Sequence, residues 1–237
     1  MNYDLHFLNL PNLLAALGLF GISRWLVSFK YADEETKRLI RIALAIGLWV
    51  DEIIWHYWNY VHGYWTVQTM LPLHICSLMI WLAGFMLIFK NYRIYEFGYF
   101  LGLGGATQVL LTSYVPLELF FEYRYFQIFI SHGLLIVAVI YMTGVEGFRP
   151  TWGSFFRVVI GTNIYMAIIF PLNLRLGSNY LFLAYKPEEF ASLLDILPAW
   201  PYYIVYMEAL GILVFLVLYL PFAIRDWRAR RGAVNPS

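Results

Sequence analysis

Apolar stretches recur along the chain, and short polar segments separate them. Each stretch holds about 20 residues, the length that a helix needs to cross a hydrocarbon core roughly 30 Å thick. Backbone groups inside a bilayer must bond within their own segment, so each stretch is expected to be a helix. The pattern predicts seven membrane spans, at residues 8–29, 39–62, 70–89, 94–116, 124–145, 153–173 and 202–224.

Composition agrees with this pattern. The 237 residues are 61% hydrophobic and only 13% charged, and the mean hydropathy is +0.64, which is too apolar for a soluble domain. The sequence therefore predicts one all-α domain over residues 1–237, a polytopic helical bundle in the cell membrane. The N-terminus lacks the basic segment and cleavage site of a removable signal, so we expect the first apolar run to be retained as a helix.

Two further counts exclude some classes of protein. A net charge of +1 does not favour nucleic acid as a partner. A single cysteine excludes a disulfide within the chain.

Basic residues predict the orientation, because they concentrate in cytoplasmic segments. They gather in alternate connectors and after the last span: Lys30, Lys37, Arg38 and Arg41, then Lys90 and Arg93, then Arg149, and finally Arg225, Arg228, Arg230 and Arg231. All four groups share one side only if the N-terminus is outside and the C-terminus is cytoplasmic. This orientation makes 225–237 a basic cytoplasmic tail and places the longest connector, 174–201, outside.

Polar residues inside the spans fall mostly in the outer half when depth is counted at about 1.5 Å per residue. Cys76 and His132 are predicted at the same level, each about two turns below an outer helix end. Intramembrane ionisable groups are costly and usually functional. The sequence therefore predicts a site in this layer, built from Glu52, His56, Cys76, Gln108, His132, Asn173 and Glu208.

Several of these residues also have a purely structural interpretation. A buried cysteine can act as a small hydrophobic residue, and His132 can serve as a polar contact between helices. Glu52 and His56 are four residues apart, so we expect them to pair with each other rather than to hold a metal.

The neighbours of the thiol are open to the same two interpretations. His74 lies nearly opposite Cys76 on a regular helix, so we do not expect it to activate the thiol unless Pro72 disturbs the turn. The glycines at 102, 104 and 105 are expected to be close-packing positions rather than a phosphate loop.

The chemistry that uses both a thiol and an imidazole is nucleophilic catalysis, because the imidazole can take the proton of the thiol. We assign Cys76 as nucleophile and His132 as general base. The thiolate would carry an acyl group from a lipid ester as a thioester, with no metal and no cofactor. Candidates for stabilising the oxyanion or orienting the substrate are His74, His56, Gln108, Glu52 and Glu208.

The connector 174–201 is long for a turn between helices, and long loops are often lids or binding loops. It carries polar and aromatic residues suited to a lid or a phosphate headgroup: Asn179, Tyr180, Lys186, Asp195 and Trp200. The alternative is an interfacial amphipathic helix over 187–197 that caps the bundle.

Four segments carry a resemblance to a known family. They are Leu71-Pro-Leu-His-Ile-Cys76, Ser131-His-Gly133, the stretch from Gly177 to Pro187 with Ser192-Leu-Leu-Asp195, and Trp200-Pro-Tyr-Tyr203. Together they resemble the YwaF-type family of bacterial integral membrane proteins. That family is similar to an animal multi-span acyltransferase of ether phospholipids with a membrane cysteine and histidine, and the resemblance implies these roles for Cys76 and His132. Ser77 stands where many bacterial members have an acidic residue.

The leading hypothesis is therefore a membrane acyltransferase or transacylase acting on phospholipid or a related acyl lipid. A lipid hydrolase would use the same residues with water as the acceptor. A transporter or lipid-binding protein would instead use Glu52, His56, Gln108 and Glu208 as a substrate or proton path.

Overall fold

The computed structural model describes residues 10–112, 122–186 and 197–234, and these ranges contain helices and no strand. The helices are α1 (Leu10–Val27), α2 (Glu34–Val61), α3 (Ile75–Phe89), α4 (Tyr92–Phe97), α5 (Leu103–Thr112), α6 (Tyr123–Gly144), α7 (Trp152–Leu176) and α8 (Tyr202–Val234), with short 3-10 turns η1 (Ser28–Tyr31) and η4 (Tyr180–Phe182). A π-helical turn, η2 (Gly98–Gly102), joins α4 to α5 without a break. The all-helical architecture is confirmed, with a helix at each predicted apolar stretch.

Four helical segments of the described chain are long and apolar enough to cross a membrane: Asn12–Tyr31, Phe126–Gly144, Trp152–Leu176 and Tyr202–Arg231. Helix α3 is apolar but shorter. α8 continues through the predicted tail as far as Val234.

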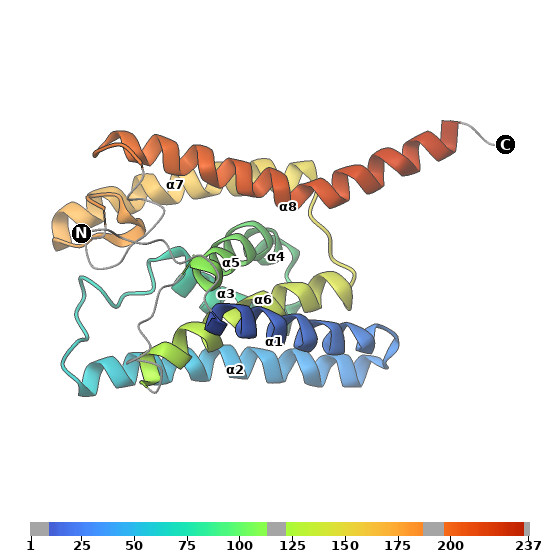
Figure 1. The fold of residues 1–237 in the computed structure, drawn as a ribbon, viewed down its shortest axis with the longest axis horizontal. Helices are drawn as coiled ribbons and strands as arrows, with labels where there is room; N and C mark the ends of the chain where they lie inside the picture. The colour runs from blue at the N-terminus through green and yellow to red at the C-terminus, as the bar shows by residue number, and fades with distance from the viewer. Residues whose placement is uncertain (1–9, 113–121, 187–196, 235–237) are drawn as a thin grey trace.

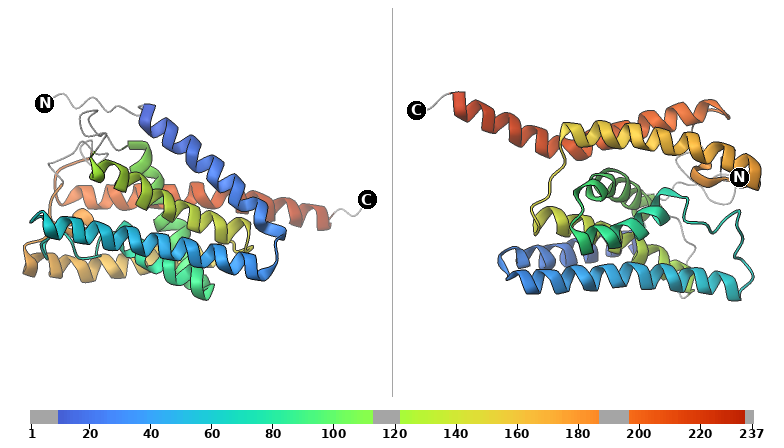
Figure 2. Two further views of the ribbon diagram at one scale, coloured as in Figure 1. Left: turned by 90° about the horizontal axis from the view of Figure 1, so that it is seen from below. Right: turned by 180° about the vertical axis from the view of Figure 1, so that it is seen from behind.

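The helices form three layers (Figure 1). α1, α2 and α6 lie on one side, α3 and the continuous α4–α5 helix lie in the middle, and α7 and α8 cover the other side. The view from behind shows the same order, with the end of α8 projecting beyond its neighbours (Figure 2). The middle layer is therefore enclosed by helices on both faces.

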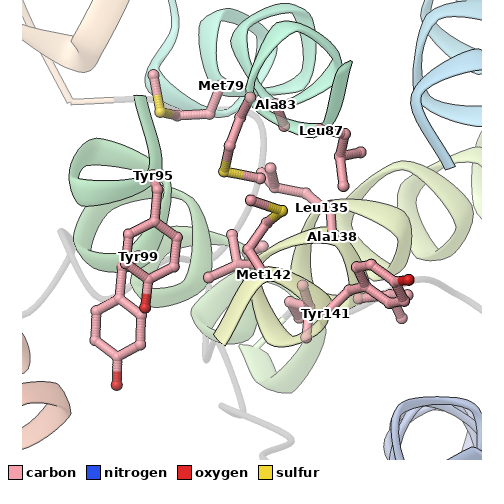
Figure 3. Close-up of a cluster of buried hydrophobic side chains, with 14 of the residues drawn as sticks. Met79, Ala83, Leu87, Tyr95, Tyr99, Leu135, Ala138, Tyr141 and Met142 are labelled. Atoms are coloured by element: carbon pink, nitrogen blue, oxygen red, sulfur yellow. The ribbon is translucent and has the colours of Figure 1, made fainter. Parts of the chain in front are cut away.

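The middle layer packs through side chains spaced at helical intervals. Residues of α3 face residues of α6, with two tyrosines of the α4–α5 helix beside them (Figure 3). The contact joins Met79, Ala83 and Leu87 to Leu135, Ala138 and Met142, with Tyr95 and Tyr99 alongside. Such spacing places one stripe of each helix in the core.

Glycines let other helices approach the α4–α5 helix closely. A Cβ on Gly102 would lie 3.4 Å from Leu135 of α6, and one on Gly104 would lie 3.2 Å from Val214 of α8. A Cβ on Gly105 would lie 3.5 Å from the Sγ atom of Cys76. The predicted close-packing role is confirmed for Gly104, whereas Gly102 and Gly105 stand at ordinary contact distance from their neighbours.

The predicted start of the third span, at residue 70, is wrong. α3 begins at Ile75, with His74 in an extended conformation as its N-cap. Pro72 disfavours helical conformation at Leu71, the residue before it, and a turn at 72–73 then delays the helix to Ile75. Cys76 therefore lies in the first turn of α3 instead of two turns inside a helix.

The charged connector before α2 folds as its sequence suggests. Asp33 caps α2 by accepting a hydrogen bond from the Thr36 N–H at 2.8 Å. This hydrogen bond holds the pKa of the Asp33 carboxyl below its usual range. Acidic residues follow in the first turn, at Glu34 and Glu35, where they complement the helix dipole.

Buried carboxylates connect the helices at the end of the bundle opposite Cys76. Glu146, which follows α6, pairs with Arg41 of α2 and Lys90 after α3. Glu96 of α4 accepts a hydrogen bond from the Arg157 Nε atom of α7 at 3.0 Å. The side chain of Glu146 is 2% exposed and that of Glu96 is fully buried, so both carboxylates depend on their basic partners.

We predict that Glu146→Gln will destabilise the fold by about 3–5 kcal/mol, because it leaves the buried Arg41 guanidinium without its charge partner. Thermal unfolding of the purified protein in detergent would measure the loss. Glu34→Gln is the matched control, since Glu34 pairs with Lys37 on the exposed surface and should matter little. Equal midpoints for the two variants would contradict the prediction.

Candidate functional site

Cys76 is held at the start of α3 by the segment before it. The Tyr180 hydroxyl accepts a hydrogen bond from the Leu71 N–H at 2.9 Å and donates one to the Val67 carbonyl at 2.7 Å. The Tyr165 hydroxyl of α7 donates to the Leu73 carbonyl at 2.9 Å. The turn-rich segment 67–74 is thus fixed to α7 and the outer connector, and it fixes the first turn of α3.

His74 turns towards this connector. Its Nδ1 atom accepts a hydrogen bond from the Leu181 N–H at 3.4 Å, and its ring packs 5.2 Å from the rings of Tyr180 and Phe182. The structure therefore uses His74 to join the connector to α3, as expected of a histidine that does not activate the thiol.

His132 lies on α6 in a defined tautomer. Its Nδ1 atom is 2.9 Å from the Ile128 carbonyl oxygen. A carbonyl can only accept, so Nδ1 carries the hydrogen of the neutral ring and Nε2 keeps its lone pair. The Ser131 hydroxyl lies 3.0 Å from the same Nδ1 atom. His132 is therefore prepared to take a proton at Nε2.

Packing on α5 places His132 and Cys76 at about the same height. Gly102 contacts Leu135, and Gly105 contacts Cys76. α5 and α6 run in opposite directions, since the chain leaves α5 and enters α6 at the same end of the bundle (Figure 2). Gly105 lies about 4.5 Å along α5 from Gly102, and His132 lies about 4.5 Å along α6 from Leu135 in the same direction. Since Gly102 contacts Leu135, His132 is level with Gly105 and therefore with Cys76.

Glu52 occupies a core position of α2. The buried stripe of that helix runs through Arg41, Ala45, Leu48, Glu52 and Asn59. The Oε1 atom of Glu52 has no hydrogen-bond partner among the described residues, but it lies 3.4 Å from the Nε2 atom of His56. At that distance the two groups attract each other without a well-formed hydrogen bond, and the expected pairing of Glu52 with His56 is confirmed.

Glu52 also connects the two candidate catalytic residues. Its carboxylate interacts electrostatically with the thiol of Cys76 and with the imidazole of His132. α2, α3 and α6 contact one another pairwise. No hydrogen bond joins Cys76 to His132 within the described chain, and the three side chains are brought towards one another by the contacts between their helices. Catalytic hydrogen bonds are often long until substrate binds.

Two other predicted residues lie elsewhere on the helices. Gln108 is exposed on α5, one turn beyond Gly105 and on the same helix face. Glu208 of α8 accepts a hydrogen bond from the Asn163 side chain of α7 at 2.7 Å. The structure thus places Gln108 on the helix whose Gly105 lies against Cys76, and it gives Glu208 a partner in the layer of α7 and α8.

The connector residues are largely engaged with the connector itself. The Asn179 side chain bonds the backbone of Ala184 and Tyr185, Lys186 donates to the Leu197 carbonyl, and the Trp200 indole donates to the Leu183 carbonyl at 3.1 Å. These contacts give the segment a fixed shape. Asp195 and nearly all of the possible helix at 187–197 lie outside the described residues.

Sequence reasoning missed the backbone amides of the first turn of α3. The first N–H groups of a helix have no partner within it, and the His74 side chain does not cap them. Cys76 and Ser77 therefore direct their N–H groups out of the helix end beside the thiol. Pro72 was the signal, since a helix resumes only after a proline of this kind. Among the described residues no three His, Cys, Asp or Glu side chains are grouped to hold a metal ion.

Comparison with known proteins gives one match. The chain matches the TMEM164 family over residues 4–219, nearly its whole length. No curated protein and no solved structure matches. The resemblance to YwaF-type proteins stays a prediction.

We predict that Tyr180→Phe will loosen the segment before Cys76. The Leu71 N–H would lose its acceptor, a defect that costs about 1–3 kcal/mol when the group is buried. Hydrogen exchange should accelerate at Leu71 and its neighbours, while Tyr202→Phe, at a position 68% exposed, should leave exchange there unchanged. An unchanged exchange rate at Leu71 in Tyr180→Phe would disprove the role of this hydroxyl.

Proposed function

Since the chain belongs to the TMEM164 family of membrane proteins, we propose that it is a membrane-embedded acyltransferase acting on phospholipid or a related acyl lipid. The observation that carries the proposal is the tautomer of His132. The Nδ1 hydrogen bond to the Ile128 carbonyl puts the lone pair of the neutral ring on Nε2, on a helix that contacts α3 and at about the height of the chain's only thiol. A base and a nucleophile at one level are what acyl transfer through a thioester requires.

The first half-reaction loads the acyl group onto the protein. His132 Nε2 takes the proton of the Cys76 thiol, and the thiolate attacks the ester carbonyl of a lipid. The ester C–O bond then breaks, and His132 returns the proton to the departing hydroxyl. A thioester on Cys76 and a lysolipid result.

The second half-reaction transfers the acyl group. The hydroxyl of an acceptor lipid gives its proton to His132 and attacks the thioester, and the departing thiolate takes the proton back. Protons and electrons balance without any cofactor. Water in place of the lipid hydroxyl would release a free fatty acid, so product analysis separates transfer from hydrolysis.

The first turn of α3 supplies the groups that would stabilise the oxyanion. The N–H groups of Cys76 and Ser77 lie next to the attacking sulfur, and preorganised donors of this type lower the barrier to acyl transfer. The positive end of the helix dipole acts in the same direction. The exposed side chain of Gln108, one turn from Gly105, is the nearest candidate for a third donor.

The proposal includes a topology of seven spans with the N-terminus outside. The site then lies in the outer half of the membrane, where a lipid donor is available and acyl-CoA, a cytoplasmic cofactor, is not. In support, α2, α4 and α7 all begin at one end of the bundle (Figure 1). Basic side chains at that end include Lys37, Arg41, Lys90 and Arg149.

Labelling tests the topology. We expect Arg228→Cys in a Cys76→Ala background to resist an impermeant maleimide on intact cells and to react once the membranes are opened. Tyr64→Cys, at an exposed position in the opposite connector, should react on intact cells. Strong labelling of position 228 from outside would reverse the orientation.

Mass spectrometry and lipid turnover test the chemistry. We expect an acyl adduct on Cys76 of the purified protein, complete loss of turnover in Cys76→Ala, and a loss of about 10²- to 10⁴-fold in His132→Ala, because general-base catalysis contributes about that much. Lipid products would be followed with a labelled donor.

The matched control is Met79→Leu, one turn deeper on the same face of α3, because such a core exchange conserves volume and should keep turnover. The mechanism fails if Cys76→Ser turns over lipid at the wild-type rate and no adduct forms in wild type or in His132→Ala.

A further inference from the structure

One buried group near the site has no part in the acyl-transfer steps. The Glu52 side chain is 2% exposed, and its Oε1 atom has no hydrogen bond to any residue that the structure describes. A carboxylate in such a place is costly. An apolar residue would fill the same position in the α2 stripe at lower cost, so the charge itself requires an explanation.

Two neighbouring side chains hold the Glu52 carboxylate in a defined setting. The Trp65 indole N–H donates to the Nδ1 atom of His56 at 3.0 Å. Indole is only a donor, so Nδ1 must accept, and the hydrogen of the neutral His56 ring lies on Nε2. That Nε2 atom is the one 3.4 Å from Glu52 Oε1. Trp65 thereby fixes His56 with its N–H towards the carboxylate.

The other groups facing Glu52 come from three helices. Asp51 belongs to α2 itself and is within 3.5 Å of the Gln127 amide, Tyr123 and His132 belong to α6, and Cys76 belongs to α3. The buried Tyr123 hydroxyl has no hydrogen-bond partner among the described residues. Of these groups, Cys76 and His132 are the two that the proposed reaction converts to ions.

We propose that Glu52 is a positioning residue for the Cys76–His132 pair, whose fixed negative charge governs when that pair is protonated, and that Trp65 and His56 hold this charge in place. The inference rests on the proposed function in taking Cys76 and His132 as the reacting pair.

The physical effect follows from the sign of the charge. A carboxylate stabilises the imidazolium of His132 after the proton has moved, and it opposes a thiolate that has no imidazolium beside it. Glu52 would therefore keep Cys76 as an unreactive thiol at rest and permit the thiolate only as an ion pair with His132. Electrostatic effects of this kind are strong where water is excluded.

The pH dependence of thiol labelling tests the inference. Cys76 is the only cysteine, so N-ethylmaleimide reports this residue alone in the purified full-length protein in detergent. We expect the curve of labelling rate against pH to move by about one unit to lower pH in Glu52→Gln, a tenfold change in a proton equilibrium. Lipid turnover should fall about tenfold or more in the same variant.

Charge and shape are separated by matched variants. Glu52→Asp keeps the charge in a shorter side chain and should keep a labelling curve closer to wild type than Glu52→Gln does. Glu122→Gln, which removes an exposed carboxylate at the start of α6, should leave the curve in place. The same displacement in Glu52→Asp and Glu52→Gln, or no displacement in Glu52→Gln, would overturn the proposal.

A double-mutant cycle tests the part played by Trp65. Trp65→Phe removes the indole donor together with part of the ring, so its electrostatic effect should move the labelling curve when Glu52 is present and be absent in Glu52→Gln. Equal effects in both backgrounds would refute this coupling. Labelling needs no lipid turnover, so a displaced curve without an acyl adduct would support the charge coupling and reject acyl transfer. An acyl adduct together with an unmoved labelling curve would support acyl transfer and reject the charge coupling.

Discussion

The late start of α3 is the constraint from which the site follows. Turns occupy residues 67–69 and 72–73, so α3 begins only at Ile75 and has 15 residues, about 22 Å at the usual rise. A full span would be nearer 30 Å. The missing helical turns are replaced by a non-helical segment that Tyr180 and Tyr165 anchor. A helix end, with its free N–H groups and positive dipole, is thereby placed beside a thiol within the bundle.

Non-helical backbone at this depth must have its polar groups satisfied by protein, because lipid offers no hydrogen bonds. The outer connector performs this task. Asn173 of α7 bonds both the N–H and the carbonyl of Tyr180, and Tyr180 in turn bonds Leu71 and Val67. The connector, the start of α3 and the end of α7 therefore form one polar assembly around the first turn of α3, and a lid function and a structural function of the connector are compatible.

Buried carboxylates have different partners at the two ends of the bundle. At the end with Glu146 and Glu96, buried carboxylates have close basic partners and serve to join helices. At the other end, the imidazole of His56 is the one group of the described residues at ion-pair distance from Glu52. A carboxylate with close basic partners has its charge neutralised by them. A carboxylate that is only partly paired still acts electrostatically on other neighbouring groups. This contrast is why Glu52, and not the more heavily buried Glu96, is the carboxylate with a functional assignment.

The sequence by itself determined the helical class, the approximate position of each helix, the cap at Asp33, the packing role of Gly104, and the pairing of Glu52 with His56. Each of these depends on local composition or on the helical period, which one segment carries alone.

The tertiary structure decided the rest. The tautomers of His132 and His56 depend on which atom lies opposite each ring, and the Trp65 contact spans a turn that has no periodic pattern. The true start of α3 required weighing Pro72 against a continuous apolar run. The separation of Glu208 from the thiol depends on which helices face each other, and no spacing along one chain encodes that.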